Sequence, residues 1–319
     1  MCSLAGVIDP NDFLCANLKR KLIRSLLIAG QVRGRDASGI AFLNGNDLRI
    51  IKAGKPARRF RFYLPEKTKI VIAHNRAASQ GSPRHNFNNH PLSGHAGDQT
   101  FTLCHNGVIW NDEQLRKQFS LPPTPIETDS FIACQLLEQY GKLDFESLKW
   151  IAETVKGSFS FTLLDDLNNL YIIKGINPIE LVLFEEIGVY VFASTEEILN
   201  RALSKSKLYG VPHKKIPLIF GDILKIDACG GMERSSFNAP VFEAWDYYFP
   251  NWHIPLETGS SLHELLEEAK IAGIDEDEIT ELFYSGYSVS QIEELLETPS
   301  LLRERLDDFE LGCNDDFEL

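Results

Sequence analysis

The sequence has no long hydrophobic run. None of its 319 residues belongs to a stretch approaching the ~20 apolar residues that a bilayer crossing needs, so no membrane association is expected. Its opening residues, MCSLAGVIDPND, contain no basic residue and do not resemble a secretory signal. A C-x-x-C pair is also absent among the six cysteines Cys2, Cys15, Cys104, Cys134, Cys229 and Cys313. Together these features predict a cytoplasmic protein with free thiols.

The sequence also lacks a clear set of metal ligands. His85, His90 and His95 recur every five residues, but they lie in a segment rich in Asn, Gly and Pro that we expect to be loop. Neither a cysteine nor a carboxylate accompanies them at a spacing typical of a metal site. We therefore predict no metal and no cofactor.

Basic residues are scarce in the last fifth of the chain. Residues 251–319 hold 3 Lys and Arg against 19 Asp and Glu, whereas residues 1–250 hold 29 against 26. The formal charge of −13 therefore combines a near-neutral body with an acidic extension. Residues 285–300 resemble the helix-turn-helix of recombinases and regulators. Because DNA affinity depends on Lys and Arg at the phosphates, the charge favours a small helical adaptor and makes nucleic acid an unexpected partner.

The spacing of apolar residues in the first half of the body predicts strands and one long helix. Residues 3–8 form a buried strand, and residues 14–29 form a helix that ends at Gly30. The strands at 38–43 and 47–53 flank Asn44-Gly45-Asn46, which is a hairpin signal. Further strands are expected at 69–76 and 100–109, and each is followed by a polar turn.

Helix starts in the second half are predicted from capping residues. Asn111 with Gln114 and Ser194 with Glu197 each suggest a capping box, and Thr128 is the expected N-cap of a helix over 128–141. Another helix is expected near 146–155. Strands are expected at residues 158–165, 169–174, 179–184, 188–194 and 221–227. This order predicts an α+β body with mainly antiparallel sheets, not the alternating βαβ pattern of a dinucleotide-binding fold.

Cys2 is the most reactive candidate residue. The initiator Met is normally removed before a small residue, and its removal would leave a thiol and a free α-amine on Cys2. The amine has a reference pKa of about 7.7–8.0, so it can act as the base for a thiol whose reference pKa is about 8.5. A Met-Cys start alone is also compatible with no function, so the interpretation depends on the rest of the chain.

Five segments follow Cys2 in a fixed order: VRGRDASGIAF (32–42), AHNRAASQG (73–81), NNHPLSG (88–94), TLCHNGVIWN (102–111) and ETDSF (127–131). With them the sequence resembles the class II glutamine amidotransferases, the N-terminal-nucleophile glutaminase domains of enzymes such as glucosamine-6-phosphate synthase and amidophosphoribosyltransferase. Residues 175–181, 191–197 and 220–227 extend the resemblance over roughly residues 2–235. It implies the four-layer αββα sandwich of N-terminal-nucleophile (Ntn) hydrolases, with two mainly antiparallel sheets.

The residues at these positions fit the hydrolysis of L-glutamine. Cys2 would attack the side-chain amide carbon, and its own α-amine would accept and return the proton. Asn106 and Gly107 would form the oxyanion hole. The resemblance implies the same two residues.

Four further residues are expected around the substrate. Arg76 would bind its α-carboxylate through two parallel hydrogen bonds. Asp129 would bind the α-ammonium, although a carboxylate at a helix start can also serve only the helix dipole. Ala77 and Ser79 would help to cover the substrate.

Several nearby positions have open roles or depart from the family pattern. Arg33 resembles an arginine that supports the nucleophile strand, and it could equally be a structural ion-pair partner. His74 and His105 suggest a Cys–His dyad, but structural roles are favoured because the terminal amine already supplies a base. Ser3 replaces the usual Gly, and Gln80 stands where some relatives have His. Ala77 replaces an aromatic residue, so the covering loop departs from the family pattern where the residues of the core chemistry do not.

We expect four regions: a glutaminase domain (2–240), an aromatic connecting segment (241–258), an acidic helical extension (259–306) and a disordered acidic tail (307–319). The pentapeptide Asp-Asp-Phe-Glu-Leu occurs twice in the tail, at 307–311 and 315–319. About 84 residues follow position 235, too few for a synthetase, phosphoribosyltransferase or isomerase domain. An acceptor enzyme that takes ammonia in trans, docked through residues 241–319, is therefore the expected partner. The alternatives are an Ntn hydrolase of another amide, or an inactive glutaminase-like scaffold that binds partners through its tail.

Overall fold

The computed structural model describes residues 1–238 and, further along, residues 269, 273–274, 279, 289–296, 298 and 301–302. The chain divides into two compact units, Met1–Phe249 and Pro250–Leu319. The second unit contains the described helix α9 (Val289–Leu296), within a stretch predicted to be helical. The aromatic segment 241–258 and both tail pentapeptides lie outside the described residues.

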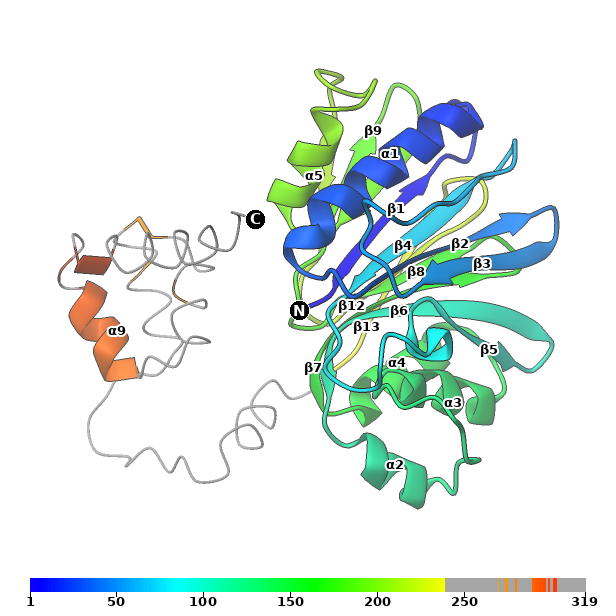
Figure 1. The fold of residues 1–319 in the computed structure, drawn as a ribbon, viewed down its shortest axis with the longest axis vertical. Coiled ribbons are helices and arrows are strands. Elements are labelled where there is room, and N and C mark those ends of the chain that lie inside the picture. The colour runs from blue at the N-terminus through cyan, green and yellow to red at the C-terminus, as the bar shows by residue number, and fades with distance from the viewer. Residues whose placement is uncertain are drawn as a thin grey trace. The chain divides into compact units, whose positions relative to one another are not determined.

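The first unit contains two antiparallel sheets (Figure 1). The first sheet has the order β11-β9-β10-β1-β4-β2-β3. Its strands are β1 (Ser3–Ile8), β2 (Ala37–Asn44), β3 (Asp47–Ala53), β4 (Ile70–Arg76), β9 (Glu180–Phe184), β10 (Val189–Ala193) and β11 (Lys214–Ile216). The strand that follows Cys2 lies in the middle of this sheet, because β1 pairs with β10 on one side and β4 on the other.

The second sheet has the order β13-β12-β8-β7-β6-β5. Its strands are β5 (Leu92–Ala96), β6 (Gln99–Ile109), β7 (Gly157–Asp165), β8 (Leu170–Ile173), β12 (Asp222–Ile226) and β13 (Met232–Ser236). Its longest strand, β6, lies between β5 and β7.

Helices cover the outer face of each sheet. Helices α1 (Ala16–Ala29) and α5 (Glu196–Leu203) pack on the first sheet. Helices α2 (Asp112–Gln118), α3 (Phe131–Tyr140) and α4 (Phe145–Thr154) pack on the second. A third apolar core fills the space between the sheets. The layers seen in Figure 1 are therefore helix, sheet, sheet and helix, which confirms the predicted αββα sandwich.

The alternation of side chains along the strands explains where polar residues gather. Leu4 of β1, Ile72 of β4 and Cys104 of β6 belong to the core between the sheets. Residues two apart on a strand face the same side. The alternation therefore places four further side chains on this inner side, near one end of the core: Cys2, His74, Arg76 and Asn106.

Most of the predicted elements are present, including the hairpin of β2 and β3 and the buried opening strand. Helix α1 begins at Ala16, two residues later than predicted, and Gly30 caps it as expected, in a right-handed conformation. Strands β5, β11 and β13 were not predicted, because they contain no continuous apolar run.

The three predicted caps are wrong in their details. Asn111 precedes α2, but its side chain bonds the backbone of Thr154 and Lys156 instead of a capping partner. Ser194 accepts a hydrogen bond from the backbone N–H of Leu4 at 2.7 Å, and the next residue caps α5. Thr128 is not the N-cap of α3, because that helix begins at Phe131. For Asn111 and Ser194 a distant backbone partner replaces the local capping contact, whereas the Thr128 hydroxyl contacts its neighbours Asp129 and Ser130.

Candidate active site

The Cys2 thiol is buried at the start of β1. Met1 before it is 70% exposed, whereas Cys2 is 9% exposed. The thiol donates a hydrogen bond to the backbone oxygen of Ala77, with an Sγ–O distance of 3.6 Å. Burial raises the pKa of the Cys2 thiol, while this hydrogen bond, the N-terminal charge and Arg76 act to lower it. A thiol in this state needs a base beside it to react near neutral pH.

The loop after α1 holds the nucleophile strand. The Arg33 Nε–H donates to the Cys2 backbone oxygen at 3.0 Å. At Gly34, a Cβ would lie 2.6 Å from the Arg76 carbonyl carbon, so no side chain fits there. The segment 33–34 therefore contacts both the nucleophile residue and the end of β4.

Arg76 is a buried cation at the end of β4. Its guanidinium donates to the side-chain oxygen of Asn89 at 2.8 Å, and to the backbone oxygens of Gln80 and Gly81. No carboxylate in the described part of the chain lies within ion-pair distance of it. Three of its five N–H groups are used in these bonds, so two remain available to a ligand.

Asp129 is a buried anion between β6 and α3. One carboxylate oxygen accepts the backbone N–H of Ile109 at 2.6 Å. The other accepts the hydroxyls of Thr128 at 3.2 Å and Ser130 at 3.4 Å. Among the described residues no cation lies within ion-pair distance of this carboxylate. Buried charges without partners are costly, so their presence here suggests a charged ligand.

Both charges act on the nucleophile. Arg76 lowers the pKa of Cys2 and Asp129 raises it, although burial has the largest effect. The same two charges act on each other, because Asp129 raises the pKa of Arg76 against the lowering effect of burial. The structure thus brings the thiol, the cation and the anion together.

The Asn106 side chain is buried on the same inner side of the sheets as those of Cys2 and Arg76. Its side chain is 0% exposed, and neither its amide oxygen nor its amide nitrogen has a hydrogen-bond partner within the described residues. Gly107 follows with a φ of +141°, and a Cβ there would lie 1.9 Å from the Ser158 backbone oxygen. Asn106 therefore carries a free, buried amide, and the next position admits only glycine.

The buried histidines serve the packing of this region. The His74 Nε2 lies 2.8 Å from the backbone oxygen of His105, and burial lowers the pKa of His74 to about 3. Its ring stacks against His90 with the ring centres 4.3 Å apart. Within the described chain, no hydrogen bond joins His74 or His105 to Cys2. This supports structural roles over a Cys–His dyad.

The remaining candidates lie at the edge of the site or apart from one another. Ala77 is half-buried and contacts Cys2, whereas Ser79 is exposed two residues later. His85 faces Glu127 at 3.9 Å and His95 contacts Thr100, so these two do not share neighbours with His90. No group of three potential metal ligands lies together in the described ranges.

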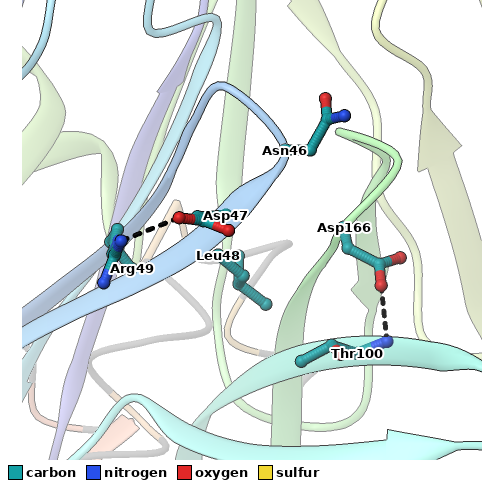
Figure 2. A pocket seen from close by; sticks show the side chains of 6 residues that line it. All are labelled: Asn46, Asp47, Leu48, Arg49, Thr100 and Asp166. Carbon is teal, nitrogen blue, oxygen red and sulfur yellow. Dashed lines mark hydrogen bonds and ion pairs between the residues drawn. The ribbon is translucent and has the colours of Figure 1, made fainter.

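A surface hollow lies elsewhere on the first unit (Figure 2). It has a volume of about 290 Å³ and lies at the β2–β3 turn, the start of β6 and the β7–β8 turn. Its lining residues are Asn46, Asp47, Leu48, Arg49, Thr100 and Asp166. Thr100 precedes Asn106 by six residues of extended strand, or roughly 20 Å. The hollow therefore lies far from Cys2.

Two supporting residues were not predicted: Asn89, which holds Arg76, and Ser130, which contacts Asp129. His105, for which a structural role was favoured, contacts Ser130. Asn89 and Ser130 lie inside segments 88–94 and 127–131, but no local spacing indicates their contacts. No described helix is long and apolar enough to cross a membrane.

Comparison with known proteins gives consistent results. Residues 74–201 match the family model described as "Glutamine amidotransferase domain". The 7-cyano-7-deazaguanine synthase 2 of Sulfurisphaera tokodaii is 30% identical over 209 residues, covering 63% of this chain and 44% of that protein. The Staphylococcus aureus glutamine–fructose-6-phosphate aminotransferase (isomerizing) is 29% identical over 251 residues, covering 76% and 40%.

A solved structure supports the fold. The glutamine phosphoribosylpyrophosphate amidotransferase from B. subtilis matches with a TM-score of 0.58 at 20% identity, covering 75% of this chain and 50% of that one. The chain spans less than half the length of the two curated relatives named here.

Proposed function

Because this chain carries a class II glutamine amidotransferase domain, we propose that it hydrolyses L-glutamine to glutamate and ammonia through a thioester on Cys2. The observation that carries the proposal is the pair of buried, oppositely charged side chains beside the thiol, Arg76 and Asp129. Neither has an ion-pair partner in the described part of the chain, and a free α-amino acid carries the two complementary charges. An amide substrate without these charges would leave both unpaired.

The reaction proceeds in two halves. After removal of Met1, the α-amine of Cys2 takes the thiol proton as Sγ attacks the side-chain amide carbon of glutamine. The amide nitrogen leaves with that proton as ammonia, and an acyl thioester remains on Sγ. Water then attacks the thioester carbon, the amine again transfers the proton, and glutamate leaves with the thiol restored.

Asn106 and Gly107 stabilise the charge that develops on the carbonyl oxygen. The unpartnered amide of Asn106 can donate to that oxygen without breaking an existing bond among the described residues. The Gly107 N–H is the second donor. Arg33 is a positioning residue in this scheme, since it holds the Cys2 backbone oxygen.

The substrate is held by its two charged groups and covered by the loop after β4. Arg76 binds the α-carboxylate through its charge and one of its remaining N–H groups, and Asp129 binds the α-ammonium. Ala77 contacts the thiol and Ser79 lies further along the same loop. In this scheme residues 2–240 are the glutaminase domain, acting in the cytoplasm.

The ammonia is passed to an acceptor enzyme in trans, docked through residues 241–319. Ammonia lost to bulk water would do no useful chemistry. The 19 acidic residues against 3 basic ones in residues 251–319 favour a basic surface on that enzyme. The two curated relatives are named for different reactions, and only one of the names mentions glutamine, so together they favour no single acceptor.

The test is glutamate release from glutamine by the purified full chain. Wild-type protein and a Cys229→Ser control, which changes an exposed cysteine, should both release glutamate. Cys2→Ser should lower the rate at least about a hundredfold, because a hydroxyl is a far weaker nucleophile than a thiol. Release that is unaffected by Cys2→Ser, or no release by the wild type, would contradict the proposal.

A further inference from the structure

A line of polar groups continues behind Asp129, away from the thiol. The Nδ1 of His105 lies 2.8 Å from the Ser130 hydroxyl oxygen. That hydroxyl lies 3.4 Å from the Asp129 Oδ1. All three side chains are buried, at 1%, 2% and 2% exposure. The His105 ring is fixed by stacking against Phe161, with the ring centres 4.8 Å apart.

Only one direction of donation satisfies both contacts at once. A carboxylate oxygen can only accept, so the Ser130 hydroxyl donates to Asp129. The Ser130 oxygen must then accept from His105, which requires the proton on Nδ1. The Ser158 backbone oxygen acts on the same ring and raises the pKa of His105, against the lowering effect of burial.

The backbone contact of Asp129 does not by itself fix the carboxylate. The Ile109 N–H holds Oδ2, whereas among the described residues Oδ1 is held by the hydroxyls of Thr128 and Ser130 alone. Rotation of the carboxylate changes where its remaining lone pairs point. The direction in which the Asp129 carboxylate can accept a hydrogen bond from a ligand therefore depends on the groups that hold Oδ1.

We propose that His105 and Ser130 are positioning residues that orient the Asp129 carboxylate toward the α-ammonium group of the substrate. This inference rests on the proposed glutaminase function. Ser130 acts on the carboxylate directly, and His105 acts by fixing the direction of the Ser130 hydroxyl. The 3.4 Å contact tightens when the ammonium binds, as such contacts do on substrate binding.

The first experiment compares two ligands that differ only at the α-carbon. One is glutamine, and the other is 4-carbamoylbutanoate, which is glutamine without its α-ammonium group. In Ser130→Ala the KM for glutamine should rise about fivefold to tenfold, the range for losing one hydrogen bond, while kcat stays within about twofold. The inhibition constant of 4-carbamoylbutanoate should stay within about twofold, because this ligand makes no contact that depends on Asp129.

Two pairs of variants separate the loss of carboxylate orientation from a general disturbance of the fold. Ser130→Thr keeps the hydroxyl and should restore most of the glutamine affinity. His105→Asn places an amide donor close to the position of Nδ1 and should be milder than His105→Leu. Ser147→Ala removes another buried serine hydroxyl, which caps α4, and it should leave both ligands unaffected.

The possible results separate a failure of these positioning roles from a failure of the proposed glutaminase function. Equal losses for both ligands in Ser130→Ala would overturn the inference, while glutamate release by the wild type would leave the proposed function intact. If Ser130→Ala does not fold, the His105→Asn and His105→Leu pair gives the same comparison, and equal behaviour of those two variants would also overturn it. No glutamate release by the wild type would refute the proposed function itself.

Discussion

Asn106→Ala separates catalysis from stability more cleanly than any other substitution in the site. The side chain is completely buried, yet neither polar atom of its amide has a partner in the described chain. Replacing it with alanine therefore removes a donor that is available only to a reacting substrate. We expect a large effect on the rate and a small effect on folding.

The magnitudes follow from these two facts. Loss of one oxyanion donor typically costs about 10²–10³ in kcat, or about 2.7–4 kcal/mol of transition-state stabilisation. A buried large-to-small change ordinarily costs about 2–5 kcal/mol of stability. Here the removal of an unsatisfied buried amide offsets about 1–3 kcal/mol of that cost. The two ranges combine to a net loss of about −1 to 4 kcal/mol in the unfolding free energy, with a midpoint of about 1.5 kcal/mol.

The assay has two parts on the same preparation. Steady-state glutamate release gives kcat and KM, and urea unfolding gives the free energy of unfolding. We expect kcat to fall about a hundredfold or more, with a fully folded protein. A kcat within about threefold of the wild type would refute the assignment of Asn106 to the oxyanion hole. A variant that does not fold would refute the argument that this amide does not hold the structure.

Three further substitutions test other parts of the site. Gly107→Ala should destabilise the fold by several kcal/mol in urea unfolding, because its Cβ would lie 1.9 Å from the Ser158 oxygen at a φ of +141°; near-wild-type stability would contradict this. Arg76→Lys should raise the KM for glutamine about tenfold or more, since lysine cannot reproduce the guanidinium bonds to Asn89 and Gly81; an unchanged KM would exclude Arg76 from the site. His74 should make folding acid-sensitive, because the unfolded chain binds a proton below about pH 6.5 while the folded chain keeps His74 neutral down to about pH 3. From pH 6.5 to pH 4.5 this histidine alone should lower the unfolding free energy by about 2 kcal/mol, and His74→Gln should remove that share of the slope.

Local patterns in the sequence were sufficient for most of the sandwich. The apolar run of β1 and the Asn-Gly turn between β2 and β3 each determine structure within a few residues. The caps failed for a physical reason. The side chains of Asn111 and Ser194 can bond either locally or to distant backbone groups, and the folded chain uses the distant ones.

In the candidate site, too, local patterns did not predict contacts between residues that are distant in sequence. The sequence located Cys2, Arg76, Asn106 and Asp129 because each lies in a short motif. It did not locate the residues that hold them, because Asn89 reaches Arg76 across 13 positions and His105 reaches Ser130 across 25. Such contacts depend on how the strand ends pack against the loops and helices, and the spacing of residues along the chain does not predict that packing. The described geometry of the sheets supplies it.

The most direct test of the account is mass spectrometry of the full chain after reaction with a diazoketone analogue of glutamine. The account predicts an N-terminal peptide that begins at Cys2 and carries one analogue on its sulfur, together with loss of glutamate release. An excess of glutamine should protect the thiol from this labelling. Met1 retained on the active protein, or an unlabelled Cys2 in protein that has lost its activity, would contradict the claim that Cys2 is the nucleophile.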